Sequence, residues 1–152
     1  MECVTKGDVI RCFQCVSNEM NTTKIIVCPE DINRTYAKDF NTLTHSNISY
    51  FIGVDVTNEA NPGLVLDGDD NLELNGTPVK PGLLNLSTSA AVTWIPGRHD
   101  NPDRLPYLDI PTEHHFYGNL GFADGSVAME SSSNLQTAFL DAGLATNRLA
   151  IP

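Results

Sequence analysis

Cysteine is absent from most of this chain. All four cysteines, Cys3, Cys12, Cys15 and Cys28, lie within its first 28 residues. This crowding predicts a local disulfide staple, and four cysteines allow three complete pairings, among which spacing does not choose. A zinc site is an alternative, although Cys12-x-x-Cys15 lacks a second close pair of thiols. A thioredoxin-like redox pair is another, although Cys12 and Cys15 fall inside a helical pattern rather than at a helix start.

Basic residues and long apolar runs are also scarce. Nine Lys and Arg stand against 19 Asp and Glu, for a net charge of −10. Such a charge repels phosphate backbones and anionic lipids, so we expect no nucleic-acid partner. No run approaches the roughly 18 apolar residues of a membrane helix, and the start of the chain lacks the pattern of a secretory signal. We interpret the acidity as solubility outside the cytoplasm.

Known catalytic signatures are missing as well. The chain has no Gly-x-Ser-x-Gly elbow, phosphate-binding glycine loop or His-Glu-x-x-His motif. His99, His114 and His115 have acidic neighbours and could form an acid–base or metal site. Most of these residues lie in a proline-rich stretch without periodicity, however, and a metal site needs three or four converging ligands. We therefore expect a protein that is not an enzyme.

The pattern that is present is that of one folded domain over residues 1–152, a length that can bury a substantial core. Val9, Phe13 and Val16 follow a helical spacing that predicts an amphipathic helix over 7–20. Ser133 and Gln136 have the spacing of a capping box, and with Gly143 they predict a helix over 133–142. The predicted strands cover 24–28, 48–54, 64–66, 83–86 and 91–95, with a final edge strand over 148–151. These elements predict an α+β fold, with the N-terminal helix packed on a mostly antiparallel sheet.

Two segments late in the chain have distinct characters. Residues 96–113 contain four prolines and no periodicity, which predicts an exposed loop. Residues 114–130 predict a β-hairpin around a two-residue Asp124-Gly125 turn, because this pair tolerates positive φ angles. The alternating apolar residues of that hairpin are expected to share one core-facing side. They are Leu120, Phe122, Val127 and Met129.

An acidic stretch earlier in the chain is a candidate cation site. Asp67, Asp69, Asn71 and Glu73 place oxygen ligands at alternate positions, which a curled loop could turn around calcium. The match to an EF-hand loop is partial, because Leu72 and Pro78 occupy the positions that require Gly and a bidentate Glu. The alternative is an ordinary solvated turn.

The hairpin segment also resembles a known family. His114 is followed after nine residues by Asp124-Gly125, with Gly118-Asn119 and Ala123 between them. This pattern resembles the prepilin-type processing-associated domain, found at the C-terminal end of bacterial type II secretion pseudopilin-like proteins. The resemblance to pseudopilin-like proteins of the Verrucomicrobia type covers most of residues 13 to 152. It continues in segments 17–20, 24–31, 49–55 and 145–152.

This resemblance implies a pilin-like globular head and a structural role. The motif residues would be His114, Gly118, Asn119, Asp124 and Gly125, with His114 hydrogen-bonding near the Asp124 turn. Pseudopilins carry a hydrophobic N-terminal helix, so the chain shown is expected to be an ectodomain or a relative without that anchor. The expected function is that of a non-catalytic subunit of a type II secretion or type IV pilus-like assembly, which packs against itself or related subunits. The alternative is a secreted or cell-surface binding module for calcium or carbohydrate, with Trp94, Tyr107 and Tyr117 as its aromatic surface.

Overall fold

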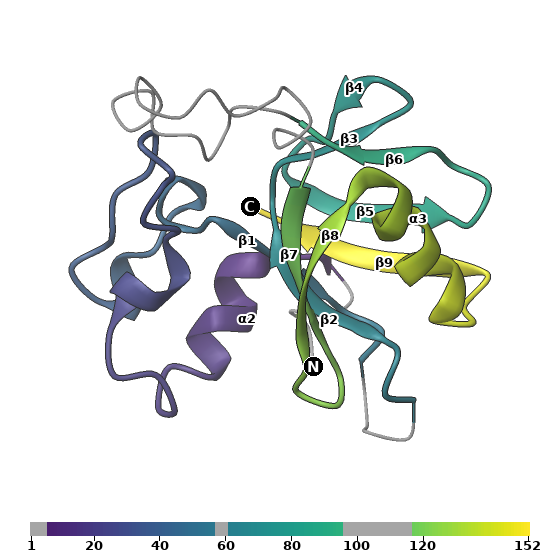
Figure 1. Cartoon of the computed structure of the whole chain (residues 1–152). Coiled ribbons are helices and arrows are strands. Elements are labelled where there is room, and N and C mark those ends of the chain that lie inside the picture. The colour runs from purple at the N-terminus through teal and green to yellow at the C-terminus, as the bar shows by residue number, and fades with distance from the viewer. Residues whose placement is uncertain (1–5, 57–60, 96–116) are drawn as a thin grey trace.

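The fold is built on a six-stranded antiparallel sheet. The computed structural model describes residues 6–56, 61–95 and 117–152. The strand order is β5-β9-β1-β2-β7-β8 (Figure 1). The strands are β1 (Tyr50–Gly53), β2 (Val65–Asp69), β5 (Gly82–Ser87), β7 (Tyr117–Phe122), β8 (Val127–Ser131) and β9 (Thr146–Ile151). With its helices, this arrangement confirms the predicted α+β class.

One face of the sheet carries the N-terminal part of the chain. Helix α2 (Val9–Cys15) begins at Asp8, whose side chain accepts a hydrogen bond from the Arg11 N–H at 3.1 Å. The prediction of a helix over 7–20 was therefore too long. After Cys15 the chain continues in single turns, since Val16, Ser17 and Asn18 are poor helix formers. Val9 and Phe13 are buried against the sheet.

Short 3₁₀ turns replace a strand that the sequence had predicted. Residues 24–28 were expected to be extended, but η1 spans Thr23–Ile26. Thr22 caps this turn by accepting a hydrogen bond from Lys24 N, and the buried Thr23 hydroxyl donates to the Ala37 carbonyl at 2.5 Å. These polar contacts favour the turn over the β preference of the Ile and Val residues. Two more turns follow, η2 (Phe40–Thr42) and η3 (His45–Asn47).

The other face of the sheet carries the main core. A second, three-stranded sheet has the order β4-β3-β6, with β3 (Leu72–Leu74), β4 (Thr77–Pro78) and β6 (Val92–Trp94). Helix α3 (Ser132–Asp141) lies beside β6 and β8 on this side (Figure 1). Trp94 is completely buried there, among residues of both sheets and α3.

Helix α3 confirms the prediction of a helix over 133–142, but its cap differs. Ser131 is the N-cap residue and accepts a hydrogen bond from Asn134 N. Gln136 is not used for capping, because it accepts from Val92 N at 3.1 Å and donates to the Thr88 carbonyl at 3.3 Å. These bonds attach the helix to the chain around β6. Gly143, with a φ of 70°, follows the helix end as predicted.

Strand β9 was predicted as an edge strand, and this was wrong. It lies inside the sheet, paired with β5 on one side and β1 on the other. Leu149, Ala150 and Ile151 are all buried, because the strand has a core on both faces. A continuous apolar run of this kind is typical of an internal strand. No helix in the described ranges is long and apolar enough to cross a membrane.

Candidate functional site

The hairpin of β7 and β8 contains most of the predicted motif, and its turn differs from the prediction. Gly125 N donates to the Phe122 carbonyl, and Phe122 N donates to the Ser126 carbonyl, both at 2.9 Å. Gly125 alone within the loop has a positive φ, of 82°. The connection is therefore a three-residue loop with glycine in the left-handed region, not a two-residue turn. The hairpin itself is confirmed from Tyr117 to Ser131.

Asp124 acts as the turn former that the sequence predicted. Its Oδ1 atom accepts hydrogen bonds from Ser126 N at 2.9 Å and Ser126 Oγ at 2.6 Å. These two bonds from Ser126 hold the pKa of the exposed Asp124 carboxyl below its usual value. The carboxylate thus stabilises the loop.

Gly118 is required by the packing of β7. A Cβ atom at this position would lie 2.7 Å from Trp94 Cζ3, so only hydrogen fits between the strand and the indole. The indole Nε1 donates to the Glu130 carbonyl of β8 at 2.7 Å. Trp94 of β6 is therefore a core residue that packs against the hairpin, and it is not part of an aromatic binding surface.

Asn119 connects the hairpin to β2. Its backbone N and its Nδ2 both donate to Asp69 Oδ2, at 2.7 and 3.1 Å. Asp69 is buried, so this pair satisfies a carboxylate that would otherwise be costly to remove from water. The motif residue Asn119 thus has a structural partner in the part of the chain predicted to bind calcium.

The four candidate calcium ligands have separate surroundings. Asp69 binds Asn119, whereas Asn71 Nδ2 donates to the Ile95 carbonyl at 3.1 Å and Glu73 accepts from Thr93 Oγ1 at 2.7 Å. Asp67 and Asp69 belong to strand β2 and not to a curled loop. Across the residues that the structure describes, no group of three or more His, Cys, Asp or Glu could hold a metal ion.

A groove lies between α2 and the sheet. It consists of two adjoining pockets of about 280 and 480 Å³, which share Phe13, Met20 and Asp67 as lining residues. The first pocket is also lined by Ile25, Ile26, Tyr50, Gly68, Asn119, Gly121 and Val127. The second pocket is also lined by Cys12, Cys15, Val16, Ile52, Gly53, Val54, Val56 and Leu66. We call these two pockets together the groove. Its lining is mostly apolar.

Asp67 and Tyr50 are the ionisable groups of the first pocket. Burial raises the pKa of Asp67, the hydrogen bond from Gly121 N lowers it, and the nearby Asp69 charge raises it. Burial also raises the pKa of the Tyr50 hydroxyl, and Cys28 and Asp69 add to that rise. Asp67 and Tyr50 therefore favour their neutral forms more than the same groups do in water. No sequence pattern predicted this pair, because the register of β1 and β2 brings Tyr50 beside Asp67 and Asp69.

The apolar residues of the hairpin do not share one face. Leu120 is completely buried and points toward Trp94 and α3 with the half-buried Phe122. Val127 and Met129 pair with Gly121 and Asn119 on the opposite face and are 72% and 70% exposed. The prediction that all four face the core was wrong, because Ala123 joins Asp124 and Gly125 in the loop and the return strand is shifted by one position.

The described residues contain no disulfide, and the predicted staple stays a prediction. Cys12, Cys15 and Cys28 are not joined to one another. Cys12 and Cys15 instead border the groove, and Cys28 lies beside the Tyr50 hydroxyl. Cys3 lies outside the described residues, as do His99, His114, His115, Tyr107 and the predicted loop 96–113.

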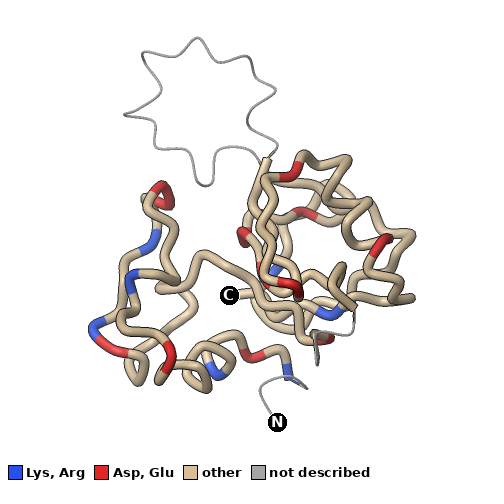
Figure 2. The backbone as a smooth tube through the Cα atoms, turned by 60° about the horizontal axis from the view of Figure 1, so that its bottom comes forward, with Lys and Arg blue, Asp and Glu red and all other residues tan. Residues whose placement is uncertain are grey.

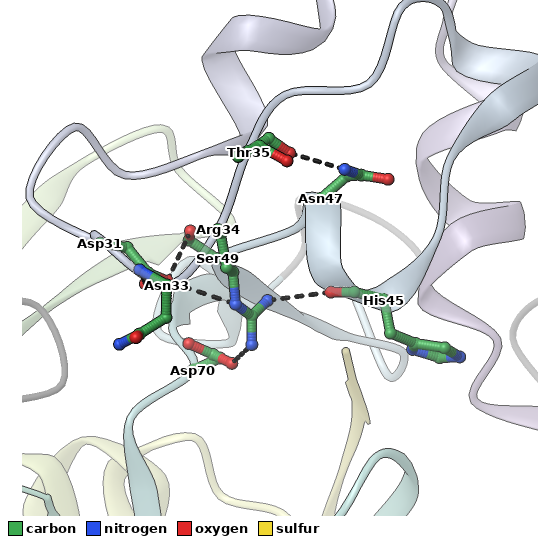
Figure 3. Close-up of polar contacts among 8 residues, drawn as sticks. All are labelled: Asp31, Asn33, Arg34, Thr35, His45, Asn47, Ser49 and Asp70. Carbon is green, nitrogen blue, oxygen red and sulfur yellow. Dashed lines mark hydrogen bonds and ion pairs between the residues drawn. The ribbon is translucent and has the colours of Figure 1, made fainter.

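Sequence reasoning missed a buried charge cluster that attaches the N-terminal segment to the sheet (Figure 3). Arg34 contacts Asp31 at 3.2 Å and also forms an ion pair with Asp70. The Arg34 side chain is 8% exposed and the two carboxylates are 1% exposed. Ser49 Oγ donates to Asp31 at 3.1 Å, and Arg34 Nη1 donates to the His45 carbonyl at 3.2 Å. The spacing of Asp31 and Arg34 was the single available signal, and Asp70 is too distant in sequence to be predicted.

The chain matches no protein-family model, no curated protein and no solved structure. The hairpin, the groove and the charge cluster are therefore the features from which a function can be inferred. In the hairpin, the described motif residues use their hydrogen bonds and their small size inside the fold. The groove offers apolar contact area around one carboxylate, that of Asp67, which both pockets share.

Proposed function

We propose that this chain is a structural, non-catalytic subunit of a pilin-like assembly of the type II secretion or type IV pilus class. It would act outside the cytoplasm as a globular head. Its partners would be copies of itself or related pilin-like subunits. The family resemblance of the His114-to-Gly125 segment suggests this class, and the surface of the described residues supports it.

The observation that carries the proposal is the apolar surface along the groove. Val16 and Leu66 line one pocket and are 42% and 38% exposed. Ile25 and Val127 line the other and are 55% and 72% exposed. Exposed apolar residues that gather on one surface, unlike scattered ones, mark sites of protein association. Burial of this surface against another subunit would provide the driving force for assembly.

The motif residues support a structural role in a second way. Gly118 admits the Trp94 ring, Asn119 binds Asp69, and Asp124 stabilises the loop. Each of these residues maintains the hairpin and its attachment to the sheet. In this role the motif residues would keep the hairpin in a fixed conformation to which other subunits could bind.

The alternative binding module is less well supported. Its aromatic surface required Trp94, which is buried in the core. Among the described residues, Tyr117 is the remaining member of that set, at 39% exposure. One partly exposed ring does not make the aromatic platform that carbohydrate recognition would use.

Sedimentation velocity over a range of protein concentrations tests the proposal. We expect the purified chain to associate with itself, or with pilin-like subunits from the same source. Val16→Lys and Leu66→Lys should weaken that association, because each places a charge in the apolar groove. Ile32→Lys is the matched control, since Ile32 is 57% exposed and does not line the groove.

The proposal fails if the chain stays monomeric and binds no pilin-like subunit. It also fails if the two groove variants associate as well as Ile32→Lys does. Circular dichroism of each variant shows whether a loss of association reflects a loss of folding.

A further inference from the structure

Strand β8 is an edge of the six-stranded sheet. Its inner side pairs with β7 over the register Tyr117↔Ser131 to Gly121↔Val127. Within residues 6–56, 61–95 and 117–152, no strand pairs with its outer side. An edge strand presents a row of backbone donors and acceptors to which another strand can bind.

The hairpin loop shows which backbone groups point outward. Phe122 N donates to the Ser126 carbonyl, so residues 122 and 126 form a hydrogen-bonded pair. Hydrogen-bonded and non-hydrogen-bonded pairs alternate along antiparallel strands, which makes Leu120 and Ala128 the next hydrogen-bonded pair. The N–H and C=O groups of Val127 and Met129 and the N–H group of Ser131 therefore point away from β7, whereas the Ser131 carbonyl accepts the first hydrogen bond of α3. The Asn119 N–H confirms this alternation, because it points away from β8 and donates to Asp69.

The side chains of β8 suit a neighbouring strand. Val127 and Met129 lie together on one face and are 72% and 70% exposed. The strand contains no proline and no lysine, two residues that commonly block edges. The opposite edge is different, because Pro81 immediately precedes β5 and the backbone of Gly7 lies close against Leu83.

Among the surfaces formed by the described residues from 50 onward, the β8 edge is the one where charge least opposes a second copy. The described residues from 50 onward hold eight Asp and Glu against Lys80 and Arg148, whereas residues 6–49 hold equal numbers of acidic and basic residues (Figure 2). Two copies would repel each other over most of the sheet side. Val127, Met129 and Ser131 of β8 are uncharged. The one acidic residue of the strand is Glu130, whose side chain lies on the other face of the sheet, where Glu130 is paired with Gly118. Strand β8 is thus a place where two acidic copies can approach.

The strand is also self-complementary. In an antiparallel pair about a two-fold axis at Met129, all five residues of β8 overlap with the second copy. Met129 then meets Met129 of the second copy, and Val127 meets Ser131 of the second copy. Met129 would exchange both backbone hydrogen bonds with Met129 of the second copy, and the Ser131 N–H would donate to the Val127 carbonyl of the second copy. Glu130 would face Ala128 of the second copy, so no two carboxylates lie directly opposite each other.

We propose that β8 pairs antiparallel with β8 of a second copy of this chain, about a two-fold axis at Met129, and extends the six-stranded sheet across both copies. The inference rests on the proposed function and adds to the groove a second contact between copies, at β8, whose Val127 also lines the first pocket. The exposed side chains of Val127 and Met129 from both copies form one continuous apolar strip on the extended sheet. A closed, isologous contact of this kind produces a dimer and no further growth by itself.

Residue-resolved amide hydrogen exchange, measured by NMR on the whole chain at low and high concentration, tests the register. The amides of Met129 and Ser131 should exchange rapidly in the dilute protein and become protected in the concentrated protein. The amides of Ala128 and Glu130 should be protected equally at both concentrations, since they already bind β7. Because the copies are acidic, added salt should strengthen the association.

Two variants test the same contact by sedimentation. Met129→Pro removes an outward N–H and leaves the ladder to β7, so it should abolish dimer formation. Met129→Lys should do the same without a backbone change, which covers the case in which the proline variant fails to fold. Leu140→Lys is the matched control, because Leu140 is an apolar residue of α3 with 47% exposure. It should leave the dimer intact.

The outcomes separate this inference from the proposed function. Self-association without concentration-dependent protection of the Met129 and Ser131 amides, or self-association unaffected by Met129→Lys, overturns the β8 contact and leaves the proposed function standing. Binding only to related pilin-like subunits, or to a strand of another protein, also overturns the β8 pairing of two copies. Absence of any association overturns both.

Discussion

Gly118 lies against the face of Trp94, and a Cβ atom on residue 118 would approach the indole ring to 2.7 Å. The indole is completely buried and is held by its hydrogen bond to the Glu130 carbonyl. It has no space to retreat, because residues of both sheets and α3 surround it. This contact joins the hairpin to the main core, as the buried Leu120 of β7 also does.

Gly118→Ala should destabilise the protein by about 1–3 kcal/mol, because the added methyl group overpacks the core. Urea unfolding followed by tryptophan fluorescence measures the loss. Gly63→Ala is the matched control, since its Cβ would have 3.7 Å to its nearest neighbour and should cost little. Equal stability of the two variants would contradict the packing described for Trp94.

Gly125→Ala should cost roughly 1–2 kcal/mol through the backbone alone, because residue 125 has a φ of 82°. No atom lies within 4 Å of its Cβ position, so steric contact adds nothing. Gly125→Asn should lose less, since Asn tolerates the left-handed region better than Ala. Thermal unfolding of the two variants gives the comparison, and an Asn variant as unstable as the Ala variant would argue against the left-handed loop.

Arg34→Met should destabilise the protein by about 3–5 kcal/mol, because it leaves the buried Asp31 and Asp70 carboxylates without their guanidinium. Arg148→Met tests an ion pair in a more exposed setting. Arg148 pairs with Asp55 but is 41% exposed, so its loss should cost at most about 1 kcal/mol. Denaturant titration of both variants is the measurement. Similar losses would show that the Arg34 cluster is not buried as described.

Asp67→Asn should change how stability depends on pH. Burial raises the pKa of Asp67 in the fold, so the protonated form is favoured there and its stabilising contribution is lost as pH rises through that raised pKa. The variant, which cannot ionise, should therefore gain stability relative to the unmodified chain as pH rises from the acidic range. Denaturant unfolding at a series of pH values measures this difference.

Asp124→Asn provides the control of opposite sign. Bonds from Ser126 lower the pKa of Asp124, so its carboxylate stabilises the fold above its ordinary pKa and that contribution is lost as pH falls. This variant should lose stability relative to the unmodified chain as pH rises. If both variants showed the same sign, the opposed environments of Asp67 and Asp124 would be wrong.

Local sequence patterns determined the elements whose causes are local. The α+β class, the hairpin, helix α3 with Gly143 beyond its end, and strands β5 and β6 follow from periodicity and from turn residues within a few positions of one another. Asp124 was likewise predicted as a turn former, since its partner Ser126 is two residues away. Interactions of this range involve residues close in sequence and need no distant partner.

Tertiary structure decided everything that depends on distant partners. Residues 24–28 form a turn because Thr23 binds Ala37, and β9 is internal because β1 and β5 both pair with it. Three side chains of the acidic stretch, those of Asp69, Asn71 and Glu73, have separate hydrogen-bond partners in Asn119, Ile95 and Thr93. Burial and register arise when segments far apart in sequence pack together. The exposed face of β8 is the clearest case, because a single extra loop residue turned Val127 and Met129 away from the core.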